Sequence, residues 1–471
     1  MRTMSNSNIA NRARRRWAAA ALAAAAFVIA ACFQTRAEAV SNFEIRIGVA
    51  EDVKSGNLRG KGLALTDARG ARLSVADGSA ISASGGGISV AGKSLALPVR
   101  VSAKSGLGWD KTRYRGTISI IRARNGFSVV NDLDLESYLR GILKMEMNPE
   151  WPFEALKAQA VLARTYAVKN RGRDAAKGYD LGATDSSQVY RGMNAEDPRT
   201  DKAVAETRGM ILTWRGAAAD AYYHSDSGGA TADISHVWGG SSPYLQVRAE
   251  RVSYTSPNST WRTTLSALQI SSIMSKMGQN VGRVRSVEVA QRDQAGRSVT
   301  LRVTGDAGSA VVKSHAFRMA AGSGVIRSTN FNISAPSGAA GTPQADQTRP
   351  DGPPRAPAKP GGADPLIEMT NGDVFTKAEM MDMLMNPGKR EEYLRIGYQR
   401  IAGKPSAPPQ AKPAQRQPAI DTVSDGNFVF SGKGWGHGVG LSQWGAKAMA
   451  ETGSRFEDIL AHYFPGTEIG K

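Results

Sequence analysis

The chain has little of the chemistry that disulfide frameworks and metal centres require. Its 471 residues include a single cysteine, Cys32, and five histidines. One cysteine excludes an intramolecular disulfide framework and any cysteine-rich zinc module. No H-E-x-x-H pattern occurs, and a site built on His224 and His236 lacks the further ligands that zinc needs. We therefore predict no metal and no cofactor.

Acidic residues are also scarce relative to basic ones. Lys and Arg number 60 against 42 Asp and Glu, which gives a formal net charge of +18. A charge of this size suits a nucleic acid, a membrane surface or an anionic polymer as partner. Hydrophobic residues make up 41% of the chain and include eight Trp, so a sizeable core is possible and wholesale disorder is excluded.

The N-terminus has the composition of an export signal. Arginines within 12–16 precede an uncharged, alanine-rich run from Trp17 to Thr35. Three outcomes stay open for residues 1–39. Ala37-Glu38-Ala39 resembles a signal-peptidase site, Ile29-Ala30-Ala31-Cys32 resembles a lipoprotein box, and the uncut run is about long enough to anchor the chain in a bilayer.

All three outcomes place the mature chain outside the cytoplasm, in the periplasm or elsewhere in the cell envelope. Membrane contact is then expected only through an uncleaved or lipidated N-terminus. Nucleic acid is no longer a plausible partner for the excess positive charge. An anionic polymer of the cell envelope becomes the better candidate.

Short strands are predicted in the first third of the chain. Phe43–Val49 alternates apolar and polar residues, as expected of a half-buried strand. Leu95–Val101 and Gly116–Ile121 show similar patterns, and Pro98 favours an edge position for the former. A later pair, Ser286–Ala290 and Ser298–Val303, is joined by a turn and predicts a hairpin.

A helical block lies between these two groups of strands. A short helix is expected to open at 134–139, and a second to run from about Trp151 to Lys169, with Pro152 near its first position. Four small or apolar residues recur with helical spacing and predict a buried stripe on the second helix, namely Leu156, Ala160, Ala163 and Ala167.

The composition changes after residue 333. Residues 334–365 and 405–424 are rich in Pro and read as linkers, and they bracket a small helical insertion at 366–404. A dense segment returns at 425–471, with helices expected at 442–451 and 455–462. We predict one folded domain made of 40–333 and 425–471, with the intervening stretch as a surface excursion.

Glu146 is the candidate for acid–base chemistry. It lies between Met145 and Met147, with Trp151 five residues further on. Apolar neighbours solvate a carboxylate poorly, so the pKa of Glu146 should rise toward the range that suits a general acid near neutral pH. The alternative is an ordinary glutamate at the surface, solvated or paired with a cation.

Two glycine-containing segments are less specific. The run Tyr223–Gly229 contains Asp-Ser-Gly-Gly, but the first histidine of the chain is His224, which leaves no upstream base for a serine protease. The segment 432–440 lacks the ending of a phosphate-binding loop. Its Trp435 and His437 suit a sugar-binding surface, whereas its glycines suit a tight crossing of backbone segments.

Together these segments resemble the SpoIID/LytB family, named after the stage II sporulation protein D and an amidase enhancer. The resemblance extends over most of 43–333 and 425–469 and leaves out the insertion at 366–404. The stretches that carry it are Leu135–Gly141, Glu146–Met147, Trp151–Pro152, Glu154–Val161, Ala163–Tyr166, Asp185, Ser187–Gly192, Ser227–Gly229, Thr231, Trp238, Pro243–Leu245, Gly434–Gly440, Ser442–Ala446 and Tyr463–Thr467.

The resemblance implies a peptidoglycan lytic transglycosylase that acts on denuded glycan strands and leaves 1,6-anhydro-N-acetylmuramic acid. It places the catalytic glutamate at Glu146. Some family members bind zinc through cysteines after the histidine matched by His224, but Ser and Asp stand there in this chain. Our candidates for substrate binding are Gln159, Arg164, Gln188, His224, Tyr254, Trp435, His437 and Gln443.

The resemblance leaves a rival role open, in which the same fold binds glycan without turnover and stimulates an N-acetylmuramoyl-L-alanine amidase. An amidase that strips stem peptides is a possible partner under either role. For the fold we expect an α+β protein, mainly antiparallel β with the helix at 152–169 packed at its centre.

Overall fold

The computed structural model describes residues 43–184, 187–334, 392, 395 and 426–470. The predicted export signal therefore lies outside the described residues, and so do the two linkers and the insertion apart from Ser334, Glu392 and Arg395. Within the described part of the chain, no helix combines the length and the apolar character needed to cross a membrane.

The chain divides into two compact units. The first contains the described residues of Met1–Tyr223 and Ala446–Lys471, and the second those of His224–Gly445. Both units contain helices and mainly antiparallel sheets, which confirms the predicted α+β class. The chain passes from one unit to the other within β16 (Tyr223–His224) and near the start of α11 (Gln443–Glu451).

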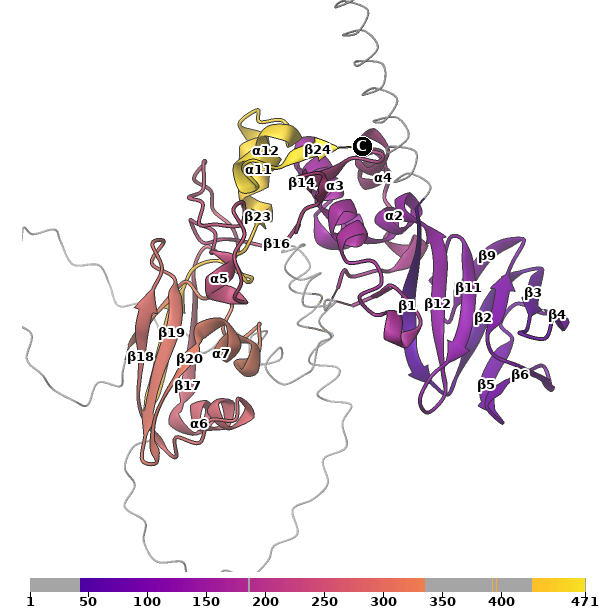
Figure 1. Ribbon diagram of the computed structural model, residues 1–471, viewed down its shortest axis with the longest axis horizontal. Helices are drawn as coiled ribbons and strands as arrows, with labels where there is room; N and C mark the ends of the chain where they lie inside the picture. Colours follow the sequence, from indigo (N-terminus) through magenta and orange to yellow (C-terminus); the bar gives the residue numbers. More distant parts are fainter. Residues whose placement is uncertain (1–42, 185–186, 335–391, 393–394, 396–425, 471) are drawn as a thin grey trace, which may run out of the picture. The chain divides into compact units, whose positions relative to one another are not determined.

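Two sheets form the N-terminal part of the first unit (Figure 1). The seven-stranded sheet has the order β13-β1-β12-β11-β8-β3-β4, and the six-stranded sheet the order β10-β9-β2-β5-β6-β7. Neighbouring strands are antiparallel except for β1 and β13. The strands are β1 (Glu44–Val53), β2 (Ser55–Lys61), β3 (Leu63–Thr66), β4 (Arg72–Val75), β5 (Ala80–Ser84), β6 (Gly87–Val90), β7 (Lys93–Leu95), β8 (Val99–Ser102), β9 (Ser105–Trp109), β10 (Thr112–Arg113), β11 (Thr117–Arg122), β12 (Phe127–Asp134) and β13 (Leu181–Gly182).

The predicted strands at 43–49 and 116–121 are confirmed as β1 and β11. The single strand predicted at 95–101 is wrong, because the chain breaks at Pro98 and forms two strands, β7 and β8, in different sheets. Pro98 has no backbone N–H for a ladder. It therefore precedes β8, which lies inside the seven-stranded sheet between β11 and β3 rather than at its edge.

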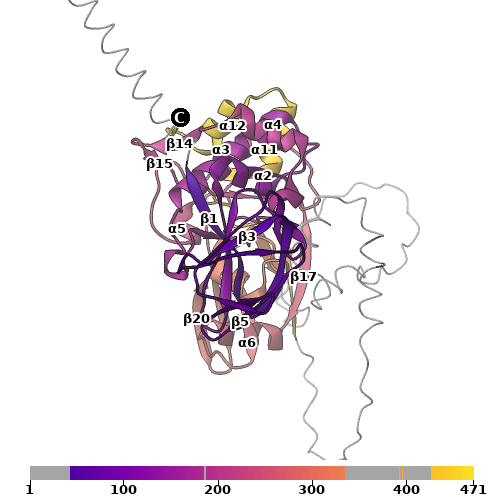
Figure 2. The same cartoon turned by 90° about the vertical axis from the view of Figure 1, so that its right-hand side faces the viewer.

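Helices gather at one end of the long strands β1 and β12 (Figures 1 and 2). Helix α2 (Leu135–Glu146) continues directly from β12, and the Asp134 side chain caps it by accepting the Ser137 N–H at 3.0 Å. The remaining elements of the unit are α3 (Phe153–Lys169), η1 (Ala175–Lys177), η2 (Gly192–Ala195), α4 (Pro198–Glu206), β14 (Ile211–Trp214), β15 (Ala217–Ala218), α12 (Phe456–Tyr463) and β24 (Glu468–Gly470).

Helix α3 is the centre of this helical group, as the sequence predicted. It contacts α2, α4, α12 and β14. All four residues of the predicted stripe are fully buried, but so are residues on the other faces of the helix, including Val161 and Leu162. Small side chains therefore let neighbours approach α3 from several directions, because alanine adds little bulk between helix axes.

A buried ion pair ties α2 to α3. The guanidinium of Arg164 donates two parallel hydrogen bonds to the Glu136 carboxylate, each 2.8 Å long. Arg164 is 0% exposed, and its remaining donors reach the Val204 and Met210 carbonyls at 3.2 and 3.0 Å. Since every polar group of the pair has a partner, the desolvation cost of the two charges is offset.

The second unit contains two three-stranded sheets with helices α6 and α7 beside them (Figure 1). One sheet has the order β17-β22-β21 and the other β18-β19-β20. The predicted hairpin is confirmed as β18 and β19, with Gly296 in the turn at φ 78°. The elements are α5 (Ile234–Val237), β17 (Trp261–Ser266), α6 (Ala267–Lys276), β18 (Val284–Arg292), β19 (Ser298–Gly305), β20 (Gly308–Lys313), α7 (Ser314–Ala321), β21 (Phe331–Ser334), β22 (Asn427–Gly432) and β23 (Leu441–Ser442).

The glycine-rich segment forms the tight backbone crossing that was one of its two interpretations. Gly434 and Gly436 both have positive φ, at 76° and 124°. A Cβ on Gly434 would lie 2.5 Å from the Asp226 carbonyl oxygen, and one on Gly436 would lie 2.6 Å from the His224 Cβ. Only glycine fits at these two positions, since both the space and the φ exclude a side chain.

Replacing Arg164 with Met should destabilise the first unit strongly. The change leaves the Glu136 carboxylate buried without its cation, which typically costs about 3–5 kcal/mol. Chemical unfolding monitored by circular dichroism measures this loss. The exposed pair Arg285–Asp306 is the control, because Arg285→Met should cost less than about 1 kcal/mol. Equal losses in the two variants would contradict the importance of the buried pair.

Candidate active site

Glu146 is the last residue of α2, beside an apolar wall. Met147 is fully buried, and Trp151 is 7% exposed. The Glu146 side chain is half-buried, so part of it stays open to a ligand while protein replaces most of its water. Desolvation by burial raises the pKa of Glu146 from its ordinary value near 4.5 to about 7, as the sequence led us to expect.

Two hydrogen-bond donors limit this rise. The backbone N–H of Val189 and the hydroxyl of Tyr223 both donate to the Glu146 carboxylate, and each bond lowers its pKa. Burial of Glu146 raises its pKa, and these two hydrogen bonds oppose that rise. The result is a carboxyl group that exchanges a proton close to neutral pH.

Gln188 positions Tyr223 for this contact. Its amide N–H donates to the Tyr223 hydroxyl at 3.2 Å and to the Ala163 carbonyl at 3.3 Å, while its amide oxygen accepts from Tyr138 at 3.2 Å. Because the Tyr223 oxygen accepts from Gln188, its own proton is available for Glu146. Burial raises the pKa of Tyr223 well above 10, so the hydroxyl stays protonated.

Gln188 is one of the predicted substrate ligands, whereas Tyr223 and Val189 are not among the predicted site residues. Gln188 is only 1% exposed, so the structure corrects its role from ligand to support for Tyr223. The sequence did hold a clue to Tyr223, since this residue begins the Tyr223–Gly229 segment and directly precedes His224. Val189 acts through its backbone, which no residue pattern reveals.

Gln159 and Arg164 also require correction. Both residues lie on α3, and neither has any exposed surface. The Arg164 guanidinium is fully engaged by Glu136 and by backbone carbonyls. A glycan strand cannot contact side chains with no exposed surface, so both belong to the core around α3 instead of lining a groove.

Two of the other candidates, His224 and His437, contribute to a cluster of aromatic rings in the second unit. The His224 ring is 5% exposed, and its Nδ1 lies 3.2 Å from the Val439 carbonyl oxygen. The His437 ring lies 5.5 Å from that of His224 and 4.8 Å from that of Trp238. Trp238 is 43% exposed and was not among our site candidates, although an open indole face suits stacking on a sugar.

Burial lowers the pKa of His224 well below 6.5, with a further contribution from His437. The His224 imidazole is therefore neutral near pH 7. A neutral ring can share the cluster with His437 without charge repulsion. We assign His224 to support of the Gly-rich crossing, and His437 and Trp238 to the open side of the cluster.

Tyr254, Trp435 and Gln443 lie elsewhere in the same unit. The Tyr254 hydroxyl donates to Asp226 at 2.9 Å and lies 3.1 Å from the Ser442 hydroxyl. Trp435 is half-buried, with the Arg327 guanidinium 4.9 Å from its ring centre. Gln443 is 7% exposed at the start of α11. Trp435 and Tyr254 are both half-buried, so both keep more surface for a ligand than Gln443.

The residues around His224 do not fit a zinc ion. Asp226 accepts hydrogen bonds from the Gly228 N–H and from the Tyr254 and Ser256 hydroxyls. Its oxygens therefore hold the loop together and are not directed at a shared centre. Among the described residues, no group of three His, Cys, Asp or Glu side chains is arranged to bind a metal.

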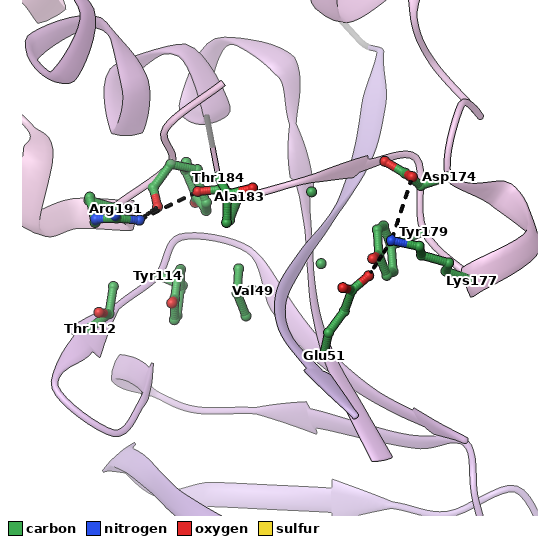
Figure 3. A pocket seen from close by; sticks show the side chains of 13 residues that line it. Val49, Glu51, Thr112, Tyr114, Asp174, Lys177, Tyr179, Ala183, Thr184 and Arg191 are labelled. Carbon is green, nitrogen blue, oxygen red and sulfur yellow. Dashed lines mark hydrogen bonds and ion pairs between the residues drawn. The ribbon is translucent and has the colours of Figure 1, made fainter. Parts of the chain in front are cut away.

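A separate cavity of about 350 Å³ opens in the first unit (Figure 3). Glu51, Lys177 and Asp174 line it, and Lys177 pairs with both carboxylates, with its Nζ 2.7 Å from Glu51 and 3.9 Å from Asp174. Arg191 reaches the Ala183 and Tyr190 carbonyls at 3.4 and 3.1 Å. None of the candidate site residues lines this cavity, so it is not part of the Glu146 site.

The structure thus defines an α+β protein with a half-buried, hydrogen-bonded glutamate at a helix end. Comparison with known proteins tests the family resemblance seen in the motifs. The model for SpoIID, stage II sporulation protein, matches residues 123–214, the segment that contains Glu146, Gln188 and helix α3. This match, with the relatives below, confirms the resemblance to the SpoIID/LytB family predicted from the motifs.

Three relatives illustrate the similarity. The amidase enhancer of Bacillus subtilis is 28% identical over 381 residues, which are 80% of this chain and 47% of the enhancer. The stage II sporulation protein D of the same organism is 24% identical over 79% of this chain and 84% of its own length. An uncharacterized protein of Brachyspira hyodysenteriae is 24% identical over 78% of this chain and 74% of its own length. The chain thus spans about half of the amidase enhancer.

The raised pKa of Glu146 predicts a pH-dependent cost in stability. Between about pH 4.5 and 7 the unfolded carboxyl ionises while the folded one keeps its proton, so stability falls as pH rises through this window. Glu146→Gln removes that cost. The variant should be more stable than the parent by about 1–2 kcal/mol at pH 8 and about equal at pH 4.

Urea unfolding at the two pH values measures the difference. Glu150→Gln is the matched control, because the Glu150 side chain is 79% exposed. It should show no such dependence on pH. A Glu146→Gln variant that is less stable than the parent at pH 8 would contradict the assigned desolvation.

Proposed function

We propose that this protein is a peptidoglycan lytic transglycosylase that cleaves the bond between N-acetylmuramic acid and N-acetylglucosamine in denuded glycan strands. The SpoIID/LytB resemblance supports a role connected with peptidoglycan, and the relative named as an amidase enhancer fits the same setting. The observation that carries the proposal is the environment of Glu146, a half-buried carboxyl with a pKa of about 7 and two hydrogen-bond donors.

Glu146 first acts as a general acid. It gives its proton to the oxygen that bridges the two sugars, and the bond from that oxygen to C1 of the muramic acid breaks. Positive charge develops on the muramic ring as an oxocarbenium-like state. The Glu146 carboxylate that remains is stabilised by the donors on Val189 and Tyr223.

Glu146 then acts as a base. It removes the proton from the C6 hydroxyl of the same muramic ring, and the C6 oxygen bonds to C1 to close the 1,6-anhydro ring. The proton returns to Glu146, so the carboxyl is ready for another cycle and no water is consumed. One carboxyl group with a pKa near the working pH is sufficient, and the second carboxylate of an ordinary glycosidase is not needed.

The substrate lies outside the cytoplasm, which agrees with the export signal proposed for residues 1–39. Denuded glycan keeps the lactyl carboxylates of its muramic acid residues. A chain with a net charge of +18 attracts such a polymer. Trp435 and His437 would contact the sugars, with Trp238 as an additional stacking surface.

Glu146→Gln should abolish formation of 1,6-anhydro-muramic ends, because the amide has no proton to give the leaving oxygen. Loss of a general acid typically lowers the rate by about 10²–10⁴-fold. Denuded glycan incubated with the full-length protein and analysed by mass spectrometry reports the product. Glu150→Gln, a matched change at an exposed glutamate, should retain activity.

The rival is a non-catalytic role, in which the protein binds glycan and stimulates an N-acetylmuramoyl-L-alanine amidase. The name of the Bacillus subtilis relative favours testing it. Under this role neither parent nor Glu146→Gln forms anhydro ends, and both stimulate an added amidase equally. That result would replace the transglycosylase proposal with the rival.

Tyr223→Phe tests Tyr223 as a positioning residue. The hydroxyl lowers the pKa of Glu146, so its removal should raise that pKa by about half a unit to one unit. A general acid must be protonated, so parent activity should fall as pH rises above about 7, and the fall in Tyr223→Phe should begin at higher pH. A pH profile of kcat/KM measures this. An unshifted profile with lower activity would indicate a merely structural role.

A further inference from the structure

A groove of about 790 Å³ in the second unit is lined by three cations and by no Asp or Glu. We propose that this groove, which we call the β17–β21 groove, binds carboxylates carried by the glycan strand. The proposal rests on the proposed function and assigns part of its substrate recognition. The lining residues used below are Trp261, Arg262, Arg292, Asn332, Ser431 and Lys433.

The sheet β17-β22-β21 arranges polar side chains in a row. Arg262 on β17 pairs with Ser431 on β22, and Ser431 pairs with Asn332 on β21. Directly paired residues project on the same face of a sheet, so these three side chains lie side by side. Arg292 extends the row, because its guanidinium donates to the Asn332 side-chain oxygen at 2.8 Å.

The positive charges of the groove are not neutralised by the protein. Arg292 also donates to the Gly296 and Phe331 carbonyls at 2.6 and 3.1 Å, which are neutral acceptors. Within the described part of the chain, neither Arg262 nor Lys433 forms an ion pair. By contrast, Arg285 and Arg302 on the neighbouring hairpin each pair with a carboxylate.

Asp293 is the acidic residue next to Arg292 in sequence, but its carboxylate faces the turn. One oxygen accepts the backbone N–H groups of Ala295 and Arg297, both at 2.9 Å. It forms no ion pair with Arg292. The excess positive charge in the groove is therefore available to an anionic ligand.

The spacing of the cations favours an extended ligand over a small ion. Strands β17 and β21 flank β22, so Arg262 and the Arg292–Asn332 end of the row are about 10 Å apart. Trp261 and Phe331 belong to the opposite face of the same sheet, where their rings lie 6.2 Å apart in the core and support the row from behind. A polymer with anionic groups at intervals matches this spacing of the cations.

Denuded glycan has this chemistry, because each muramic acid residue carries one lactyl carboxylate. The groove also adjoins the Gly-rich crossing, since a Cβ on Gly228 would lie 2.9 Å from the Lys433 Cβ. The strand bearing the carboxylates would thus pass close to the Ser227–Gly229 loop. Recognition of the carboxylates here is separate from proton transfer at Glu146.

Binding of soluble denuded glycan tests the groove. The parent and the groove variant both carry Glu146→Gln, so that the glycan is bound without being cleaved. Adding Arg262→Gln and Lys433→Gln should weaken binding about ten-fold, as expected for two partly solvated charge contacts. Glycan whose carboxylates have been amidated should bind the parent and the variant equally. The matched control is Lys276→Gln with Arg302→Gln, two exposed cations that do not line the groove.

Equal binding of denuded glycan by the groove variant and the parent would overturn the inference. The inference would also fail if the groove variant lost as much affinity for amidated glycan as for denuded glycan. Loss of binding to a glycerol phosphate polymer alone, with glycan binding unchanged, would assign the groove to phosphate instead. The proposed function is tested separately, by whether the chain with native Glu146 forms anhydro products. The groove inference can therefore fail while the proposed function holds.

Discussion

The proposed chemistry depends on the solvation of one carboxyl group. Burial of Glu146 disfavours its charge, and the donors on Val189 and Tyr223 favour it. If burial were absent, the pKa would stay near 4.5 and the proton would be gone at neutral pH. If the donors were absent, the pKa would rise further and the carboxyl would give its proton to the leaving oxygen less readily. The two effects together keep the pKa near 7.

This balance requires that the end of α2 stay fixed relative to the loop bearing Val189. The Glu136–Arg164 pair locks the first turn of α2 to the fully buried helix α3. Gln188, which directly precedes Val189, holds the loop against α3, since its amide donates to the Ala163 carbonyl on α3 and to the Tyr223 hydroxyl. Two residues that sequence reasoning assigned to substrate thus act through position, because buried polar groups in a helical core are used to satisfy one another.

Local patterns predicted much of the fold. Asp134 and Pro152 marked the starts of two helices, and Gly296 marked a hairpin turn, because each of these residues favours one local geometry. The break at Pro98 and the division into two units depend on contacts distant in sequence. For the candidate site, the raised pKa of Glu146 was predictable from its apolar neighbours. The backbone contact of Val189 and the exposure of Trp238 were not, since both depend on tertiary structure.

The raised pKa of Glu146 also restricts where the protein can place Lys and Arg side chains. A Lys or Arg beside this carboxyl would lower its pKa and remove the proton that the reaction needs. Among the described residues, burial and two neutral donors set its pKa, and no charged side chain contributes. A polymer with many carboxylates nevertheless has to be attracted by positive charge. Cations without acidic partners, such as Arg262 and Lys433 in the second unit, satisfy that need while the acid stays in neutral surroundings.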